Sequence, residues 1–249
     1  MQTRQFIISP AAFGRALLAL VAVISVLGLV AEIAYALNGR SDPWELRHFT
    51  SLSHEENLPT WVASCLLFGC AVLLALIGRD TVAHPAINQT INQVAPAKTF
   101  TRYWYGLAAI FGYISLDETS QIHENWHWID TDGGVLYFSW IIPAGIITGL
   151  IGLTYLRFLL HLPQATRKRV LLAAVLFVGG ALGMELPLGY WTDQAGASNL
   201  GYGMIDWLEE TMELAGTALF LYALLLHWLR GPVTVQLSEA AVDPDPGAG

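Results

Sequence analysis

Charged residues are scarce in this chain of 249 residues, and their scarcity decides its class. They make up 13% of the sequence, whereas 54% of it is hydrophobic and the mean hydropathy is +0.49. Because soluble globular domains carry about 25% charged residues, the composition excludes an ordinary soluble domain of this size. The sequence is typical of a membrane protein.

Basic runs and glycine-rich phosphate loops are missing as well, and the net charge is -8. These absences argue against nucleic acid as a partner. Cysteine is nearly absent: Cys65 and Cys70 lie five residues apart in one apolar run and so face different directions. That spacing predicts neither a disulfide nor a metal pair, and we expect both side chains to be buried packing groups.

Long apolar runs are what the sequence has in abundance. Each of six runs approaches or exceeds the roughly 20 residues that a membrane-spanning helix needs. They cover residues 13–37, 60–78, 102–128, 135–160, 169–191 and 206–229. We therefore predict an all-α fold, a single six-helix transmembrane bundle over 1–230, followed by a disordered acidic tail over 231–249. A cleaved signal peptide is the alternative for the first run, but that run is too long for one and contains Glu32.

The positions of the cations predict how the helices are oriented. With the amino terminus in the cytoplasm, ten Lys and Arg residues lie inside and only Arg40 and Arg47 lie outside. Membrane insertion favours this excess of cations on the inside. We therefore expect both termini in the cytoplasm and the chain in the inner or plasma membrane of a bacterium. The polar loop over 38–59 then faces the periplasmic or extracellular side, either as a solvated loop or as a lid that supplies a ligand such as His54.

The third run ends in an unusual stretch, Leu116–His127, which carries three carboxylates and two imidazoles. Each ionisable group costs on the order of 2.5 to 3.5 kcal/mol at the centre of a bilayer, so the cluster needs partners, metal or water. If the helix continues, Asp117, Glu124 and His127 share one stripe and Glu118 lies off to the other side.

A second acidic stripe lies near the start of the last run, where Asp206, Glu209, Glu210 and Glu213 fall on one helical face. Glu185 and Glu32 are at a similar depth in two further runs. Glu185 follows a glycine-rich segment and precedes Pro187, which predicts a close helix contact and then a kink. We expect four helices to converge on one site in the outer half of the bundle.

So many carboxylates in a low dielectric require either protons or a cation, and a divalent metal ion such as Zn, Fe or Mn is the economical answer. Glu124 and His127 have the Glu-x-x-His spacing of dimetal carboxylate bundles, while His123 and His127 have the spacing of a zinc pair. The predicted metal ligands are His123, Glu124, His127, Glu185, Glu209 and Glu213. Asp117 and Glu118 are the predicted catalytic residues, as a general base or as orienters of the ligands.

Simpler interpretations of these residues stand beside the metal site. Asp117, Glu118 and Glu185 can make structural hydrogen bonds to neighbouring helices. Glu124, His127, Asp206 and Glu209 can lie at the membrane surface, because helix boundaries read from a sequence are uncertain by about two to four residues.

Two segments resemble a signature of small uncharacterised bacterial multi-pass membrane proteins. They are Leu116–Glu124, with the pattern LDExxxIHE, and Glu209–Gly216, with the sequence EETMELAG. The resemblance implies a six-helix membrane protein and supplies no activity. His123 and His127 are also similar to the paired histidines of the membrane metal hydrolases that include alkaline ceramidases, but the helix count and the lack of a third intramembrane histidine depart from that superfamily.

Three functions are compatible with this sequence. The leading hypothesis is a metal-dependent membrane enzyme that acts on a lipid or another substrate close to the bilayer. A proton- or cation-coupled transporter or channel is the alternative, although the inner halves of the helices offer few polar groups for a pathway. The third hypothesis is a non-catalytic subunit of a membrane complex.

Overall fold

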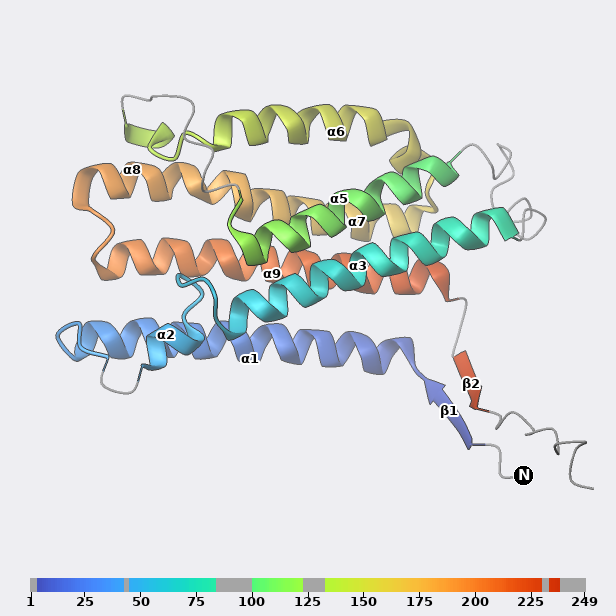
Figure 1. The fold of residues 1–249 in the computed structure, drawn as a ribbon, viewed down its shortest axis with the longest axis horizontal. Helices are drawn as coiled ribbons and strands as arrows, with labels where there is room; N and C mark the ends of the chain where they lie inside the picture. The colour runs from blue at the N-terminus through green and yellow to red at the C-terminus, as the bar shows by residue number, and fades with distance from the viewer. Residues whose placement is uncertain (1–3, 43–44, 84–99, 123–132, 230–232, 238–249) are drawn as a thin grey trace, which may run out of the picture.

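Six long helical units lie side by side along the longest axis of the molecule (Figure 1). The computed structural model describes residues 4–42, 45–83, 100–122, 133–229 and 233–237. In these ranges the units are α1 (Pro10–Leu37), α3 (Leu58–Ala83), α5 (Thr101–Ser120), α6 (Ile141–His161), the continuous α7–η4–α8 (Gln164–Val178, Gly179–Met184, Glu185–Ala195) and α9 (Leu200–Trp228). They correspond to the six predicted runs, and the all-α class is confirmed.

Five of these units are long and apolar enough to cross a membrane, namely α1, α3, α6, α7–η4–α8 and α9. The remaining unit, α5, carries Arg102, Asp117 and Glu118 among several tyrosines, which lower its hydropathy. Its 20 residues still reach about 30 Å, the thickness of the hydrocarbon layer. The chain is a multi-pass membrane protein.

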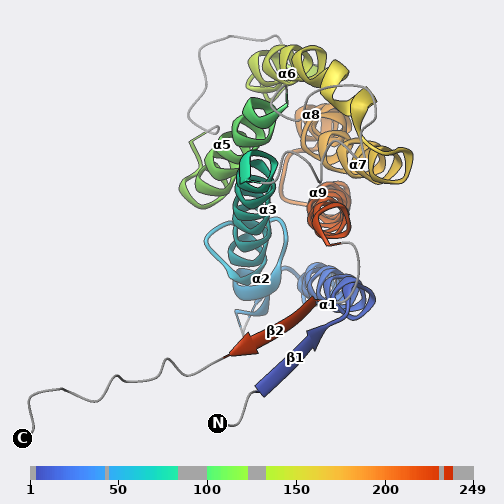
Figure 2. The same cartoon turned by 90° about the vertical axis from the view of Figure 1, so that its right-hand side faces the viewer.

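Short elements connect the helices, and two of them pair near the two ends of the chain. They are α2 (Leu46–Thr50), the 3-10 turn η3 (Gly134–Leu136), and the strands β1 (Arg4–Ile8) and β2 (Val233–Leu237). The strands pair antiparallel at one end of the bundle (Figures 1 and 2). Strand β2 corrects the prediction of disorder for that part of the tail, because its alternation of β-branched and polar residues favours a strand. The rest of the predicted tail, 238–249, lies outside the described residues.

Helix α9 is the element around which the others gather, since it packs against α1, α3, α7, η4 and α8 (Figure 2). The most deeply buried side chains of the core are Leu67, Cys70 and Leu74 on α3 and Leu224 on α9. Cys70 is buried as expected, whereas Cys65 is exposed, so the expectation that both are buried was wrong for Cys65.

Hydroxyl groups fasten α3 to α5 near the end of α5. The Ser115 hydroxyl donates to the Ser64 carbonyl oxygen at 2.9 Å, and the Ser64 hydroxyl lies 2.8 Å from the Ser115 carbonyl oxygen. Thr119, one turn further on, donates to the Ser64 hydroxyl at 2.9 Å. These contacts fix the rotation of the last turns of α5, which carry Asp117 and Glu118.

Candidate functional site: a carboxylate cluster around helix α9

The acidic residues of α9 lie well inside that helix and not at its first turn. The helix begins at Leu200, six residues before the predicted start, because the Asn199 side chain accepts a hydrogen bond from the Tyr202 amide at 3.0 Å and caps it. At 1.5 Å per residue, Asp206 is about 9 Å and Glu213 about 20 Å along the axis from Leu200. Glu213 therefore lies far from the first turn of the helix.

Glu213 is at the centre of a group of carboxylates from three helical units. The charges that act on it most strongly are those of Glu118 on α5, Glu209 on its own helix and Glu185 on α8. Glu210, three residues before Glu213, is influenced most by Glu213 and Glu118. We call these residues, together with Asp206, the carboxylate cluster. It comprises Glu118, Glu185, Asp206, Glu209, Glu210 and Glu213.

Glu209 is the most thoroughly buried member of the cluster, with 6% of its surface exposed. Its Oε2 atom has no hydrogen-bond partner among the described residues, and the same holds for Oδ2 of Asp206. Leaving a buried carboxylate oxygen without a partner is costly, so such an atom indicates a proton, water or cation that completes its environment.

Glu185 enters the cluster directly after a π-helical segment, η4 (Gly179–Met184). A Cβ added to Gly180 in this segment would lie 2.8 Å from the Glu209 carbonyl oxygen and from Cγ of Glu213, so only glycine allows this approach to α9. The Trp140 indole donates to Oε1 of Glu185 at 3.2 Å. The predicted close helix contact before Glu185 is therefore present, and the kink stays a prediction. The segment that makes the contact is a π-helix, a form often found at functional sites.

The α5 side of the cluster differs from its predicted geometry. The helix ends at Ser120 and not at the predicted residue 128, and Gln121 has a left-handed backbone with φ of 53°. Glu118, which the helical count put off the polar stripe, is the α5 carboxylate that acts on Glu210 and Glu213. The charge of Asp117 acts on Tyr113, one turn earlier on the same helix.

The predicted ligands His123, Glu124 and His127 lie outside the described residues. The spacing of Glu124 and His127 on one helix therefore stays a prediction. Among the residues that are described, no group of three His, Cys, Asp or Glu side chains has an arrangement that could hold a metal ion. The predicted ligands Glu185, Glu209 and Glu213 are brought into one cluster, and any complete metal site needs further ligands beside them.

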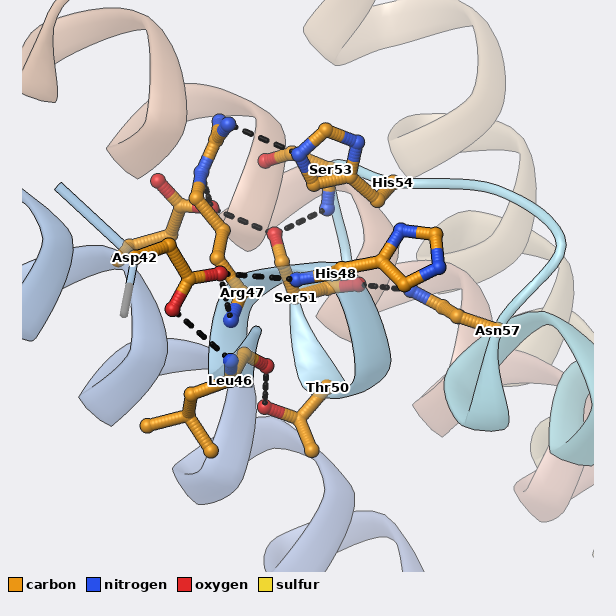
Figure 3. A network of polar contacts seen from close by, with 10 residues as sticks. Asp42, Leu46, Arg47, His48, Thr50, Ser51, Ser53, His54 and Asn57 are labelled. Carbon is orange, nitrogen blue, oxygen red and sulfur yellow. Dashed lines mark hydrogen bonds and ion pairs between the residues drawn. The ribbon is translucent and has the colours of Figure 1, made fainter. Parts of the chain in front are cut away.

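Glu32 of α1 borders the cluster and is held by Arg47 and Ser51, which belong to the network of polar contacts in Figure 3. Its Oε1 accepts from Nε of Arg47 at 2.8 Å and from the Ser51 hydroxyl at 2.5 Å. Only 4% of the Glu32 surface is exposed, and Glu32 and Arg47 both act on Asp206 of α9. The carboxylates of four helical units thus lie near one another, as the sequence predicts.

The loop after α1 folds over that network and supplies its cation. The Asp42 carboxylate accepts from the backbone amides of Leu46 and Arg47, both at 2.9 Å, and so holds the start of α2. Arg47 Nη1 lies 2.8 Å from Nε2 of His54, which joins the far end of the loop to the same guanidinium. The loop is therefore a structured cap next to the cluster, and His54 faces Arg47.

His54 has a pKa below its usual value of 6.5. Burial is the main cause, since it disfavours the charged imidazole, and the positive charge of Arg47 acts in the same direction. The carboxylates of Glu32 and Asp42 oppose the shift without overcoming it. His54 is therefore neutral near pH 7 and able to accept a hydrogen bond from Arg47.

Sequence reasoning did not identify Arg47 and Ser51 as the partners of Glu32. One signal was present: Arg47 is one of only two cations that the orientation rule puts on the outer side, and Glu32 is the acidic residue of the preceding helix. What was missing is the reversal of the chain after α1, which residue spacing alone does not reveal. In the structure Glu32 forms an ion pair with Arg47.

Fold and site together define a multi-pass helical membrane protein with a carboxylate cluster beside its last helix. Residues 16–228 match the family model described as "Domain of unknown function (DUF8692)", and the chain belongs to this family. The match covers all six helical units except the first six residues of α1, and agrees with the resemblance to uncharacterised multi-pass proteins. No curated protein and no solved structure matches the chain.

Proposed function

We propose that the carboxylate cluster binds a divalent cation and that the protein is a metal-dependent membrane enzyme acting on a substrate close to the lipid. The apolar helices indicate a helical membrane protein in contact with the bilayer. The cation and the enzyme activity are inferred from the carboxylate cluster. The proposed setting is the inner or plasma membrane, with the site toward the periplasmic or extracellular side.

One observation carries the proposal: the buried Glu209 and its neighbour Glu213 have other carboxylates as their strongest charged neighbours. Several negative charges in a low dielectric repel one another by several kcal/mol unless a cation or protons neutralise them. A divalent ion does so for two carboxylates at once, and carboxylate oxygens are good ligands for such ions.

The roles of the individual residues follow from where they lie. Glu185, Glu209 and Glu213 are the proposed ligands from the described part of the cluster, and Glu118 is the proposed base because it lies next to Glu210 and Glu213. His123, Glu124 and His127 follow α5 after only a few residues, which makes them candidates for the remaining ligands. Asp117 is the proposed orienting residue, and Zn, Fe or Mn the proposed ion.

The metal content of detergent-purified protein, measured by elemental mass spectrometry, tests the proposal. We expect stoichiometric zinc, iron or manganese in the wild type and its loss from both Glu213→Ala and the double variant Glu124→Ala/His127→Ala. Glu56→Gln, in the exposed part of the loop, is the matched control and retains the metal. A folded wild type that stays metal-free after zinc, iron and manganese have been offered contradicts the proposal.

Proton-coupled transport is the second candidate, and a specific observation favours it. The described residues form no three-ligand metal group, and carboxylates that share protons need no such geometry. In that case the protein reconstituted in vesicles carries protons across the bilayer when a pH gradient is applied, and Glu213→Gln abolishes the flux. A metal-loaded protein without proton flux excludes this candidate.

A further inference from the structure

A small pocket lies between the end of α1 and the start of α9, apart from the carboxylate cluster but next to it. Its cavity volume is about 80 Å³. It is lined by Glu32, Tyr35, Ala36, Arg40, Arg47 and the segment Ala197–Leu200. We propose that this pocket binds the phosphate headgroup of an anionic membrane lipid.

Arg47 forms the inner wall of the pocket and is already positioned. Its guanidinium lies over the ring of Tyr35, with Cζ 4.6 Å from the ring centroid, and its Nε is paired with Glu32. One guanidinium charge in the pocket is therefore neutralised by a carboxylate. Nη1 of Arg47 is also in contact with Nε2 of His54. Because the stacked, ion-paired group is held in one orientation, the N–H groups that it does not share with Glu32 and His54 are available to a ligand at little entropic cost.

Arg40 supplies the positive charge of the pocket that Glu32 does not neutralise. Its backbone is left-handed, with φ of 66°, and its amide donates to the Tyr35 carbonyl oxygen at 2.9 Å, which folds the chain back over the last turn of α1. Within the described ranges Arg40 has no ion pair. With one carboxylate and two guanidinium groups among its lining residues, the pocket has a net charge of one positive unit.

The facing wall is made by the residues that begin α9. Ser198 is one of the lining residues, and Leu200 starts a helix of 29 residues in which the amides before Tyr202 have no intrahelical acceptor, whereas the Tyr202 amide donates to Asn199. Those amides and the guanidinium groups suit the same ligand, because phosphate oxygens accept hydrogen bonds from both. The pocket thus presents donors on two sides to an anion.

Exposed apolar side chains beside the pocket indicate a lipid and not a free anion. Leu37 is 81% exposed, Leu200 45% and Ile33 41%, and all three lie on the helix ends that form the pocket. The ends of membrane-spanning helices lie at the depth of the headgroups, so these side chains can meet acyl chains while the arginines meet phosphate. The combination fits an amphiphile with an anionic head.

Native mass spectrometry of the full-length protein in a neutral detergent tests this inference. Phosphatidylglycerol, phosphatidylcholine and inorganic phosphate are added separately. The wild type is expected to retain phosphatidylglycerol in preference to phosphatidylcholine, and Arg40→Gln to bind it roughly tenfold more weakly, as the loss of one charge-assisted contact implies. Arg157→Gln, an exposed arginine on α6, is the matched control and binds as the wild type does.

Equal retention of phosphatidylglycerol by Arg40→Gln and Arg157→Gln overturns the inference, as does a wild type without preference between the two lipids. Binding of inorganic phosphate that depends on Arg40, with no added affinity for the lipid, overturns the lipid assignment and leaves a site for a free anion. The test is independent of the cation site, because Arg40 lies outside the carboxylate cluster. Lipid binding by a metal-free protein supports this inference even where the proposed enzyme function fails.

Discussion

Arg47 and Glu32 form an ion pair of 2.8 Å between the loop that caps the bundle and the end of α1. The pair has unequal surroundings: 4% of Glu32 is exposed and 20% of Arg47. Ser51, itself fully buried, also donates to Glu32, and the pair lies within electrostatic range of Asp206 on α9. It is thus the structural link between the loop, α1 and the edge of the carboxylate cluster.

Removing the cation of this pair is expected to destabilise the protein strongly. Arg47→Gln leaves the buried Glu32 without its counter-ion, and breaking a buried pair in this way costs about 3 kcal/mol or more. Arg40→Gln, an exposed neighbour, is the matched control and changes stability by less than about 0.5 kcal/mol. Unfolding in a detergent titration measures both; equal midpoints for the two variants contradict the role assigned to Arg47.

His54 predicts a pH dependence of stability. Its pKa is lowered in the folded state from 6.5, so below about pH 6.5 the unfolded chain binds more protons at this position than the folded chain. The stability that the neutral imidazole contributes is complete above that pH and is lost as the pH falls. We expect the free energy of unfolding of His54→Gln to depend less steeply on pH between pH 7 and pH 5 than that of the wild type. An unchanged slope in this variant contradicts the lowered pKa.

The π-helical segment offers a test of the close approach to α9. Gly180→Ala puts a methyl group 2.8 Å from the Glu209 carbonyl oxygen and from Cγ of Glu213, so the segment must move away at a cost of about 1 to 3 kcal/mol. Gly183→Ala, in the same segment, meets nothing within 4 Å and is the matched control. Thermal unfolding in detergent compares the two. A variant of Gly180 as stable as that of Gly183 argues against the packing at this site.

The orientation in the membrane stays a prediction from the distribution of cations. With six spans both termini lie on one side, and the pairing of β1 with β2 is compatible with this. Cytoplasmic termini predict that green fluorescent protein fused to the carboxyl terminus fluoresces, while alkaline phosphatase fused there is inactive. Fluorescence without phosphatase activity is expected; the reverse pattern inverts the assignment and moves the cluster to the cytoplasmic half.

The sequence predicted the all-α class and the approximate positions of the six long helical units in the described ranges, because an apolar run of about 20 residues that crosses a bilayer forms a helix. Helix ends were less predictable. At the start of α9, Asn199 can be recognised as a cap only if the residues from Leu200 onward are already taken as helical. At the end of α5, Gln121 has a left-handed backbone, although the sequence after it is compatible with a helix. These two boundaries determine how deep the acidic residues lie.

The membership of the cluster was predictable in part. Carboxylates are rare in apolar helices, so Glu32, Glu185 and Glu213 could be singled out by residue type and depth alone. Which face of α5 meets α9 depends on the contacts of Ser64 with Ser115, which follow from how α3 packs on α5 and not from periodicity. For the same reason Glu118 rather than Asp117 faces Glu213, and Arg47 was missed as the partner of Glu32.

The central claim is that a cation neutralises the carboxylate cluster. Infrared difference spectroscopy measures it directly, by comparing metal-stripped protein with the same sample after zinc or manganese has been added. The account predicts that protonated carboxyl groups lose their protons on metal addition in the wild type, and that the change is markedly smaller in Glu213→Gln but not in Glu56→Gln. Carboxyl bands that do not respond to either metal in the wild type would contradict the claim.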